Sequence, residues 1–134
     1  MTPQEIETAM GQRLAGISPA PRIVWPNKDA TPALPYLRFK HIPVSVEDDT
    51  LDNTGRRQVG LVLVTVVAQR DSFTTGANTL AQAVADRFPR GLRLPVAGKG
   101  DILIRRWPET VDGFHDKTGD WNVPVRISWE TEEQ

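Results

Sequence analysis

The sequence predicts an α+β domain with a mainly antiparallel β-sheet and two amphipathic helices packed on one of its faces. Two segments carry apolar residues at helical spacing, and several others alternate apolar with polar residues or are rich in β-branched residues, as strands are. The expected order is a helix, two strands, a long strand, a second helix, a hairpin and a final strand. A chain of 134 residues has the length of one domain, so we expect residues 1–134 to fold as a single unit.

The first expected element is a helix over residues 3–15. Thr2 is a good N-cap, Pro3 suits the first helical position, and Glu5 is placed to complete a capping box. Apolar residues then recur every three or four positions, and Gly16 follows the last full turn. The segment therefore predicts an amphipathic helix with a defined start and end.

The region after this helix is poor in regular structure until the first substantial strand. Residues 19–35 are rich in proline, so only residues 22–25 can form a short strand there. Residues 36–46 alternate and predict a strand with an edge or bulge at Pro43. Residues 47–58 are polar and contain turn-forming residues, which indicates a hairpin loop.

A long strand over residues 59–69 is expected because this segment is nearly all apolar and β-branched. One of its faces carries Val62, Val64 and Val66, and the other carries Val59, Leu61, Leu63 and Val67. One face can pack on helices, whereas the other needs a second sheet, a loop or another copy of the molecule.

The second half of the chain predicts one helix and three strands. Residues 75–88 repeat alanine and larger apolar residues at helical spacing. Residues 92–96 and 101–107 flank a short glycine-containing connection and predict a hairpin. Residues 108–120 are expected to form a long polar loop, and residues 121–130 alternate without exception, which predicts a strand with one buried face.

Charge and composition narrow the function classes. The 16 Lys and Arg residues against 17 Asp and Glu residues give a net charge of −1, so nucleic acid is not the default partner. The absence of cysteine excludes disulfides, thiolate nucleophiles and thiolate zinc sites, and two histidines are too few for an imidazole-rich metal cage. None of the serines lies in a Gly-x-Ser-x-Gly elbow. We therefore expect no enzyme activity, cofactor or metal.

The sequence also indicates where the protein resides. No apolar run approaches the roughly 18 residues of a membrane helix. The amino terminus lacks the charged and apolar regions of a signal peptide. We therefore expect a soluble protein that stays in the cytoplasm where it is made, and no membrane partner.

Two segments leave alternative functions open. The loop 109–120 holds four acids and His115, and it is the candidate site of a small ligand- or metal-binding, enzyme-like domain. The segment from Arg87 to Arg106 holds six cations against only Asp101, a local balance of +5, and is the candidate surface of an adaptor that contacts DNA.

Several aromatic positions are expected to pack rather than to react. His41 shares an alternating face with Leu37 and Phe39, which favours a packed or partner-facing histidine over a catalytic base. The four tryptophans combine a large ring with one polar atom, which suits core or interface positions: Trp25, Trp107, Trp121 and Trp129.

Several segments occur together in an informative combination. They are the N-terminal amphipathic helix, Val24-Trp25-Pro26-Asn27 followed by Pro32 and Tyr36, the long strand 58–69, Gly76 opening the helix that closes with Arg87-Phe88-Pro89, and the terminal Trp121-Asn122-Val123-Pro124-Val125 strand. In this combination, over nearly its whole length, the chain resembles the tail terminator-like proteins of long-tailed bacteriophages and prophages.

The resemblance implies a structural protein that caps the head-proximal end of the tail tube as a ring, typically a hexamer. Such a ring stops tube polymerisation and presents a surface for head attachment. The implied partners are other copies of the chain, the tail tube protein and a head completion protein, with no sequence-specific nucleic acid, and the implied destination is the virion tail. The subunit itself can remain monomeric until a tube end nucleates the ring.

Two groups of residues are the expected interface. A ring requires two different patches of one subunit to meet in neighbouring copies. We expect the long strand to supply one patch through Val62, Val64 and Val66. The loop 47–57 is expected to become ordered when a partner binds, with Arg56 and Arg57 meeting acidic residues on the tube or on a neighbour.

Overall fold

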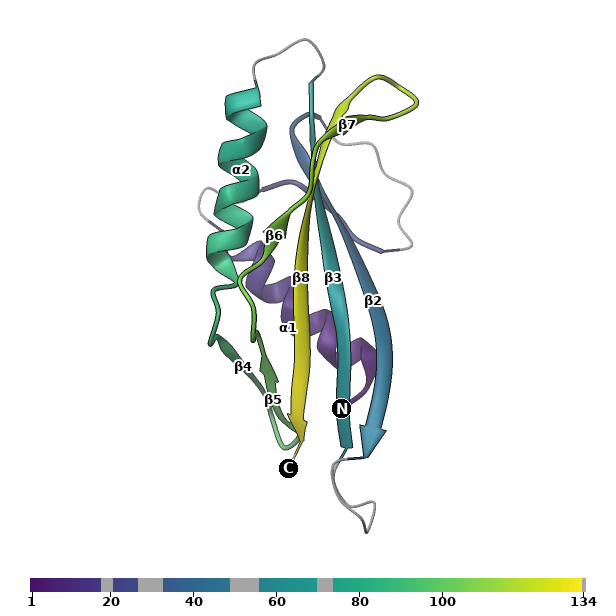
Figure 1. Ribbon diagram of the computed structural model, residues 1–134, viewed down its shortest axis with the longest axis vertical. Coiled ribbons are helices and arrows are strands. Elements are labelled where there is room, and N and C mark those ends of the chain that lie inside the picture. The colour runs from purple at the N-terminus through teal and green to yellow at the C-terminus, as the bar shows by residue number, and fades with distance from the viewer. Residues whose placement is uncertain (18–20, 27–32, 49–55, 70–73, 134) are drawn as a thin grey trace.

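The computed structural model describes residues 1–17, 21–26, 33–48, 56–69 and 74–133 (Figure 1). These residues form an α+β structure, as the sequence predicts. Its elements are α1 (Pro3–Ala15), β1 (Ile23–Val24), β2 (Tyr36–Asp48), β3 (Arg56–Ala68), α2 (Thr74–Arg87), β4 (Arg93–Val96), β5 (Gly100–Leu103), β6 (Glu109–Thr110), β7 (Phe114–His115) and β8 (Trp121–Glu133).

Helix α1 begins where the capping signal places it. The Thr2 hydroxyl accepts a hydrogen bond from the backbone N–H of Glu5 at 3.2 Å, and the Glu5 carboxylate accepts one from the backbone N–H of Thr2 at 3.0 Å. Both hydrogen bonds satisfy backbone N–H groups that have no partner within the helix. The prediction of a helix over residues 3–15 is confirmed.

The strands form one mixed sheet in the order β1-β2-β3-β8-β5-β4, and β6 and β7 also pair with β8. Strand β1 runs parallel to β2, whereas the other described pairings are antiparallel. The register of β2 on β3 shifts between Pro43 and Ser45, which confirms the bulge expected at Pro43. Proline has no N–H to donate to the ladder, so the irregularity falls there.

The sheet extends further than the sequence patterns predict. Residues 108–120 were expected to be a loop, but they contain β6 and β7, which pair with β8. The backbone N–H of Val111 also donates to the Pro124 carbonyl at 2.9 Å. Strands of two residues are too short for any periodicity to show, and they form here because the long β8 offers an unpaired edge.

The hydrophobic core contains apolar side chains of both helices and of alternate residues along the long strands. Phe39, Val64 and Val125 lie opposite one another across β2, β3 and β8, and all three are buried. The helices contribute further fully or almost fully buried side chains, namely Ile6, Met10, Leu14, Ala81, Val84 and Phe88. In the view of Figure 1, α1 lies behind the long strands and α2 lies along the side of β8.

The structure corrects the choice of outward-facing residues on the long strand. Val62, Val64 and Val66 are each 0% exposed and belong to the core cluster of their own chain. The alternate residues Leu61 and Leu63 are only partly buried. Alternation shows that a strand has two apolar faces, but it does not show which of them the helices cover.

Candidate interaction surfaces

The side of β2, β3 and β8 that faces away from the core is partly uncovered, and we call it the open face. Its middle consists of Ile42, Leu61 and Leu63, which are partly buried. Lys40, Leu63 and Arg126 form one row across the three strands, and both cations are exposed. The open face therefore combines apolar side chains with positive charge.

One end of the open face is covered by the chain itself. Val24, Tyr36 and Val67 form a second small cluster there, against which Leu34 packs. This cluster explains why Val67 is buried although it lies opposite to the main core. At this end of the open face, apolar side chains are therefore covered, whereas Leu61 and Leu63 stay partly exposed.

The two arginines expected to meet a partner lie at the start of β3. Arg57 forms an ion pair with Glu130 of β8 at 3.2 Å, so this guanidinium binds an acid of its own chain. Arg56 is placed in the ladder opposite Asp48, but its side chain lies outside the described residues, as do residues 49–55. A partner for either arginine stays a prediction.

Two arginines of the basic segment from Arg87 to Arg106 form ion pairs with acids of the described residues. Arg93 contacts Glu132 at 2.7 Å and Asp101 at 3.4 Å. Arg105 contacts Glu130, and it lies 3.9 Å from Glu132. The two acids of β8, Glu130 and Glu132, reduce the local balance from +5 to +3, which weakens the surface as a site for phosphates.

Another arginine of this segment joins the ends of the two helices. The Arg87 side chain donates to the Arg13 carbonyl at 2.8 Å, and the Arg13 side chain donates to the Arg87 carbonyl at 2.9 Å. These bonds satisfy carbonyls at the ends of α1 and α2, where cations are favoured. Burial, and next the positive charge of Arg87, lower the pKa of Arg13. Residues 74 positions apart give no sequence signal for this contact.

The acidic segment 109–120 contains β6 and β7 and ends in a tight turn, residues 116–120, between β7 and β8. Asp116 accepts hydrogen bonds from the hydroxyl and backbone N–H of Thr118, the backbone N–H of Asp120 and the side chain of Asn122. The Thr118 hydroxyl is the largest cause that lowers the pKa of Asp116 to about 2. The donors of this turn stabilise the carboxylate, so Asp116 is the hydrogen-bonding centre of the hairpin end.

No group of three or more His, Asp or Glu side chains in the described part of the chain is placed to hold a metal ion. A hollow of about 340 Å³ lies between α1 and Trp25, lined by residues that include Glu7, Gly11 and Pro26. This hollow does not combine several acids with an imidazole. Among the helices that the structure describes, none is long and apolar enough to cross a membrane.

His41 is packed between the sheet and α1. Its side chain is 3% exposed, its ring centroid lies 5.3 Å from that of Trp129, and its Nδ1 lies 3.9 Å from a carboxylate oxygen of Glu7. Burial lowers the pKa of His41, and the nearby Glu7 partly offsets this effect. The expectation of a packed histidine is confirmed.

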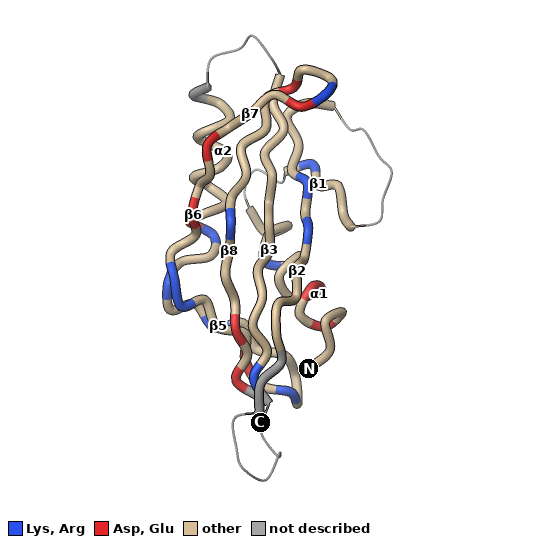
Figure 2. Tube along the Cα trace, turned by 45° about the vertical axis from the view of Figure 1, so that its right-hand side comes forward, with Lys and Arg blue, Asp and Glu red and all other residues tan. Residues whose placement is uncertain are grey.

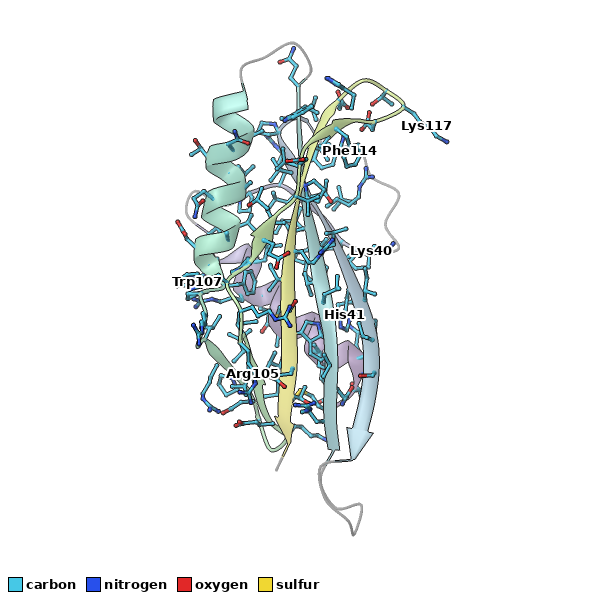
Figure 3. All side chains as sticks on the ribbon, viewed as in Figure 1. Lys40, His41, Arg105, Trp107, Phe114 and Lys117 are labelled. Carbon is cyan, nitrogen blue, oxygen red and sulfur yellow. The ribbon has the colours of Figure 1, made fainter. Side chains whose placement is uncertain are left out.

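Exposed large hydrophobic side chains are few among the described residues. They are Trp25 (38% exposed), Val44 (62%), Trp107 (60%) and Phe114 (50%). Trp129, by contrast, is a core residue that is 2% exposed. The tryptophans therefore divide between core and surface. Figure 3 shows Phe114 and Lys117 on the β7–β8 hairpin and Trp107 on the same side of the molecule as α2.

These surfaces suit contacts between proteins, because they combine exposed aromatic and aliphatic side chains with unneutralised charge. Comparison with known proteins identifies the family. The phage tail terminator protein family matches residues 5–129, and the chain belongs to this family. The protein is thus a structural component of a phage-type tail.

Solved structures share its fold. One has a TM-score of 0.78 at 22% sequence identity, covering 98% of this chain and 96% of that chain. Another, from the virion of a native gene transfer agent particle, has a TM-score of 0.68 at 17% identity, covering 96% of this chain and 95% of its own. No curated protein matches the sequence.

Proposed function

We propose that the protein caps the head-proximal end of a tail tube as a ring of identical subunits. Membership of the phage tail terminator family carries this proposal. The cap stops tube polymerisation and offers its outer surface to a head completion protein. Residues 1–134 act as one unit, without chemical catalysis, and assembly takes place in the bacterial cytoplasm.

The uncovered side of β3 supports a role in assembly. Leu61 and Leu63 remain partly exposed in the single subunit, and Lys40 and Arg126 flank them. Burial of apolar area contributes about 25 cal/mol per Å², so covering these side chains with another protein favours association. A subunit that carries such a surface is suited to act in contact with other proteins.

The end of the sheet where β2 and β3 meet is the proposed contact with the tube or a neighbouring copy. Strand β2 ends at Asp48 and β3 begins at Arg56, so the segment 49–55 joins them at this end. We assign Arg56 to this contact. Arg57 reaches it only by giving up or sharing its ion pair with Glu130.

The proposal is tested by assembling tail tubes from purified tube protein with and without this protein. With the protein present, we expect tubes that stop growing and carry one additional ring of density at one end in electron micrographs. Tubes that elongate equally in both samples and show no end density would refute the proposal. Bovine serum albumin at the same concentration controls for crowding.

A further inference from the structure

The upper part of the sheet has two opposite edges that differ in charge. Across the sheet the order is β1, β2, β3 and β8, and β6 and β7 pair with the far side of β8. We call Arg22, Arg38 and Lys40 the basic edge, and Glu109, Asp112, Asp116 and Asp120 the acidic edge. Figure 2 shows blue segments beside β1 and β2, and red segments at β6 and at the β7–β8 turn, where one blue segment also lies.

The two sequence segments that contain these edges carry equal and opposite formal charge. Residues 21–45 contain four cations and one acid, a balance of +3, whereas residues 108–120 contain four acids and one lysine, a balance of −3. The whole chain has a net charge of only −1, so this separation is a feature of the surface and not of the composition. Complementary patches on one molecule favour association of identical copies.

The basic edge is not neutralised within the described part of the chain. Arg22 donates to the Ala33 and Pro35 carbonyls, and Arg38 donates to the Tyr36 hydroxyl, all of which are neutral groups. No described acid lies within 4.0 Å of the charged nitrogens of Arg22, Arg38 or Lys40. The positive charge of this edge is therefore available to a partner.

The acidic edge also retains charge. Glu109 lies 3.8 Å from Arg126, and both side chains are about half exposed or more. Asp112 is exposed and forms no ion pair with any described residue. An ion pair between exposed groups contributes little, about 1 kcal/mol or less, so Glu109 can reorient toward a second cation at small cost.

The sheet register aligns the two edges. Lys40 lies opposite Leu63, Leu63 opposite Arg126, and Arg126 opposite Glu109. Residues that lie directly opposite one another point to the same face of a sheet. One row therefore begins with a lysine at one edge and ends with a glutamate at the other. A second copy beside the first would bring Glu109 of one molecule near Lys40 of the next.

Exposed hydrophobic side chains accompany the charges at both edges. Trp25 follows β1, and Val44 lies on the bulge of β2, which is the strand that carries Lys40. Trp107 precedes β6, and Phe114 lies on β7. Every exposed large hydrophobic of the described residues thus lies within four positions, along the sequence, of a charged residue of one edge. Aromatic side chains can bury apolar area and stack against cations of a partner.

We infer that the basic edge of one copy binds the acidic edge of the next copy. This inference rests on the proposed ring, and it identifies the two surfaces that join neighbouring subunits. The contact is heterologous, because two different patches meet, and repeated heterologous contacts close into a ring when the rotation between copies allows it. Pro43 and the bulge interrupt the outer edge of β2, so side chains make the contact and no continuous strand ladder forms.

Charge reversal tests this contact. One variant carries Arg38→Glu and Lys40→Glu, and a second carries Glu109→Lys and Asp112→Lys. A control carries Arg90→Glu and Lys99→Glu, two exposed positions outside both edges, and has the same change in net charge as the first variant. Circular dichroism and thermal unfolding establish that each variant is folded.

Association is measured by sedimentation velocity over a range of concentrations, and ring formation by electron microscopy on tube ends. Each edge variant alone is expected to weaken association by about tenfold or more, because like charges then meet. In a ring in which the two edge variants alternate, every contact joins either two reversed edges or two unchanged edges, so opposite charges meet again. The association constant of the mixture is therefore expected to return to within about threefold of that of the original protein. The control associates as the unchanged protein does.

The outcomes separate this inference from the proposed function. If the unchanged protein forms rings on tube ends and both edge variants do so equally well, the edge contact is wrong and the proposed function stands. If only the basic-edge variant fails and mixing does not rescue it, the basic edge binds the acidic surface of another protein, which also overturns the inference. If the unchanged protein neither associates nor caps tubes, the proposed function itself is wrong.

Discussion

Truncating Leu63 or Val64, two adjacent residues of β3, is expected to lower the free energy of unfolding by different amounts. The smaller side chain, Val64, is expected to cause the larger loss. Val64 is 0% exposed in the core, whereas Leu63 lies partly exposed on the open face. Leu63→Ala removes three carbon atoms and Val64→Ala removes only two. If burial decides the outcome, the smaller truncation destabilises the folded subunit more.

The magnitudes follow from burial and packing. Removing two buried methyl groups loses about 1.6 kcal/mol of transfer free energy, and the cavity left among Phe39 and Val125 raises the total to about 2–3 kcal/mol. At Leu63 solvent and neighbouring side chains fill the space, so we expect a loss of about 1 kcal/mol or less. Val64→Asp places a carboxylate in the core and is expected to unfold the subunit.

Urea unfolding of both alanine variants is monitored by circular dichroism, at a protein concentration low enough to keep the protein monomeric. The free energy of unfolding should fall more for Val64→Ala than for Leu63→Ala, with unchanged dependence on urea. Equal losses, or a larger loss for Leu63→Ala, would show that the subunit covers the open face itself. A folded, stable Val64→Asp protein would refute the assignment of the core face.

Three further changes have expected outcomes. Gly60→Ala places a Cβ 2.5 Å from the Trp129 ring and 2.7 Å from a backbone carbonyl, so the thermal midpoint of unfolding should fall. Gly76→Ala places its Cβ where no atom lies within 4 Å, so this variant should leave the midpoint unchanged or raise it. An equal response of the two variants would contradict the packing around Gly60. Because burial lowers the pKa of His41 in the folded chain, the unfolded chain binds the proton more readily, and stability should decrease as pH falls from about 7 to about 5. His41→Phe should flatten this dependence in unfolding experiments, and an unchanged slope would assign it to other groups. Deleting residues 49–55 should leave circular dichroism unchanged and abolish tail joining, and an unaltered yield of infectious particles would refute the role of this segment.

The sequence alone is sufficient to predict an element when the residues that define it lie close together in the chain. The capping box of Thr2 and Glu5 defines the start of α1, because both of its hydrogen bonds span three residues. Strict alternation identifies β8, and Pro43 identifies the bulge in β2. The family resemblance was likewise visible in the sequence, and residues 5–129 match the family. The sequence by itself therefore determined the helices and the longer strands, the class of fold and the family.

Contacts between distant residues depended on the tertiary structure. Both faces of β3 are apolar, so only the positions of the helices decide that Val64 is core and Leu63 is not. Glu132 neutralises Arg93 from 39 positions away. The two charged edges likewise become opposite sides of one sheet only because β3 and β8 pair between them. Local patterns describe which residues a strand presents, whereas burial and charge pairing depend on which elements the fold brings together.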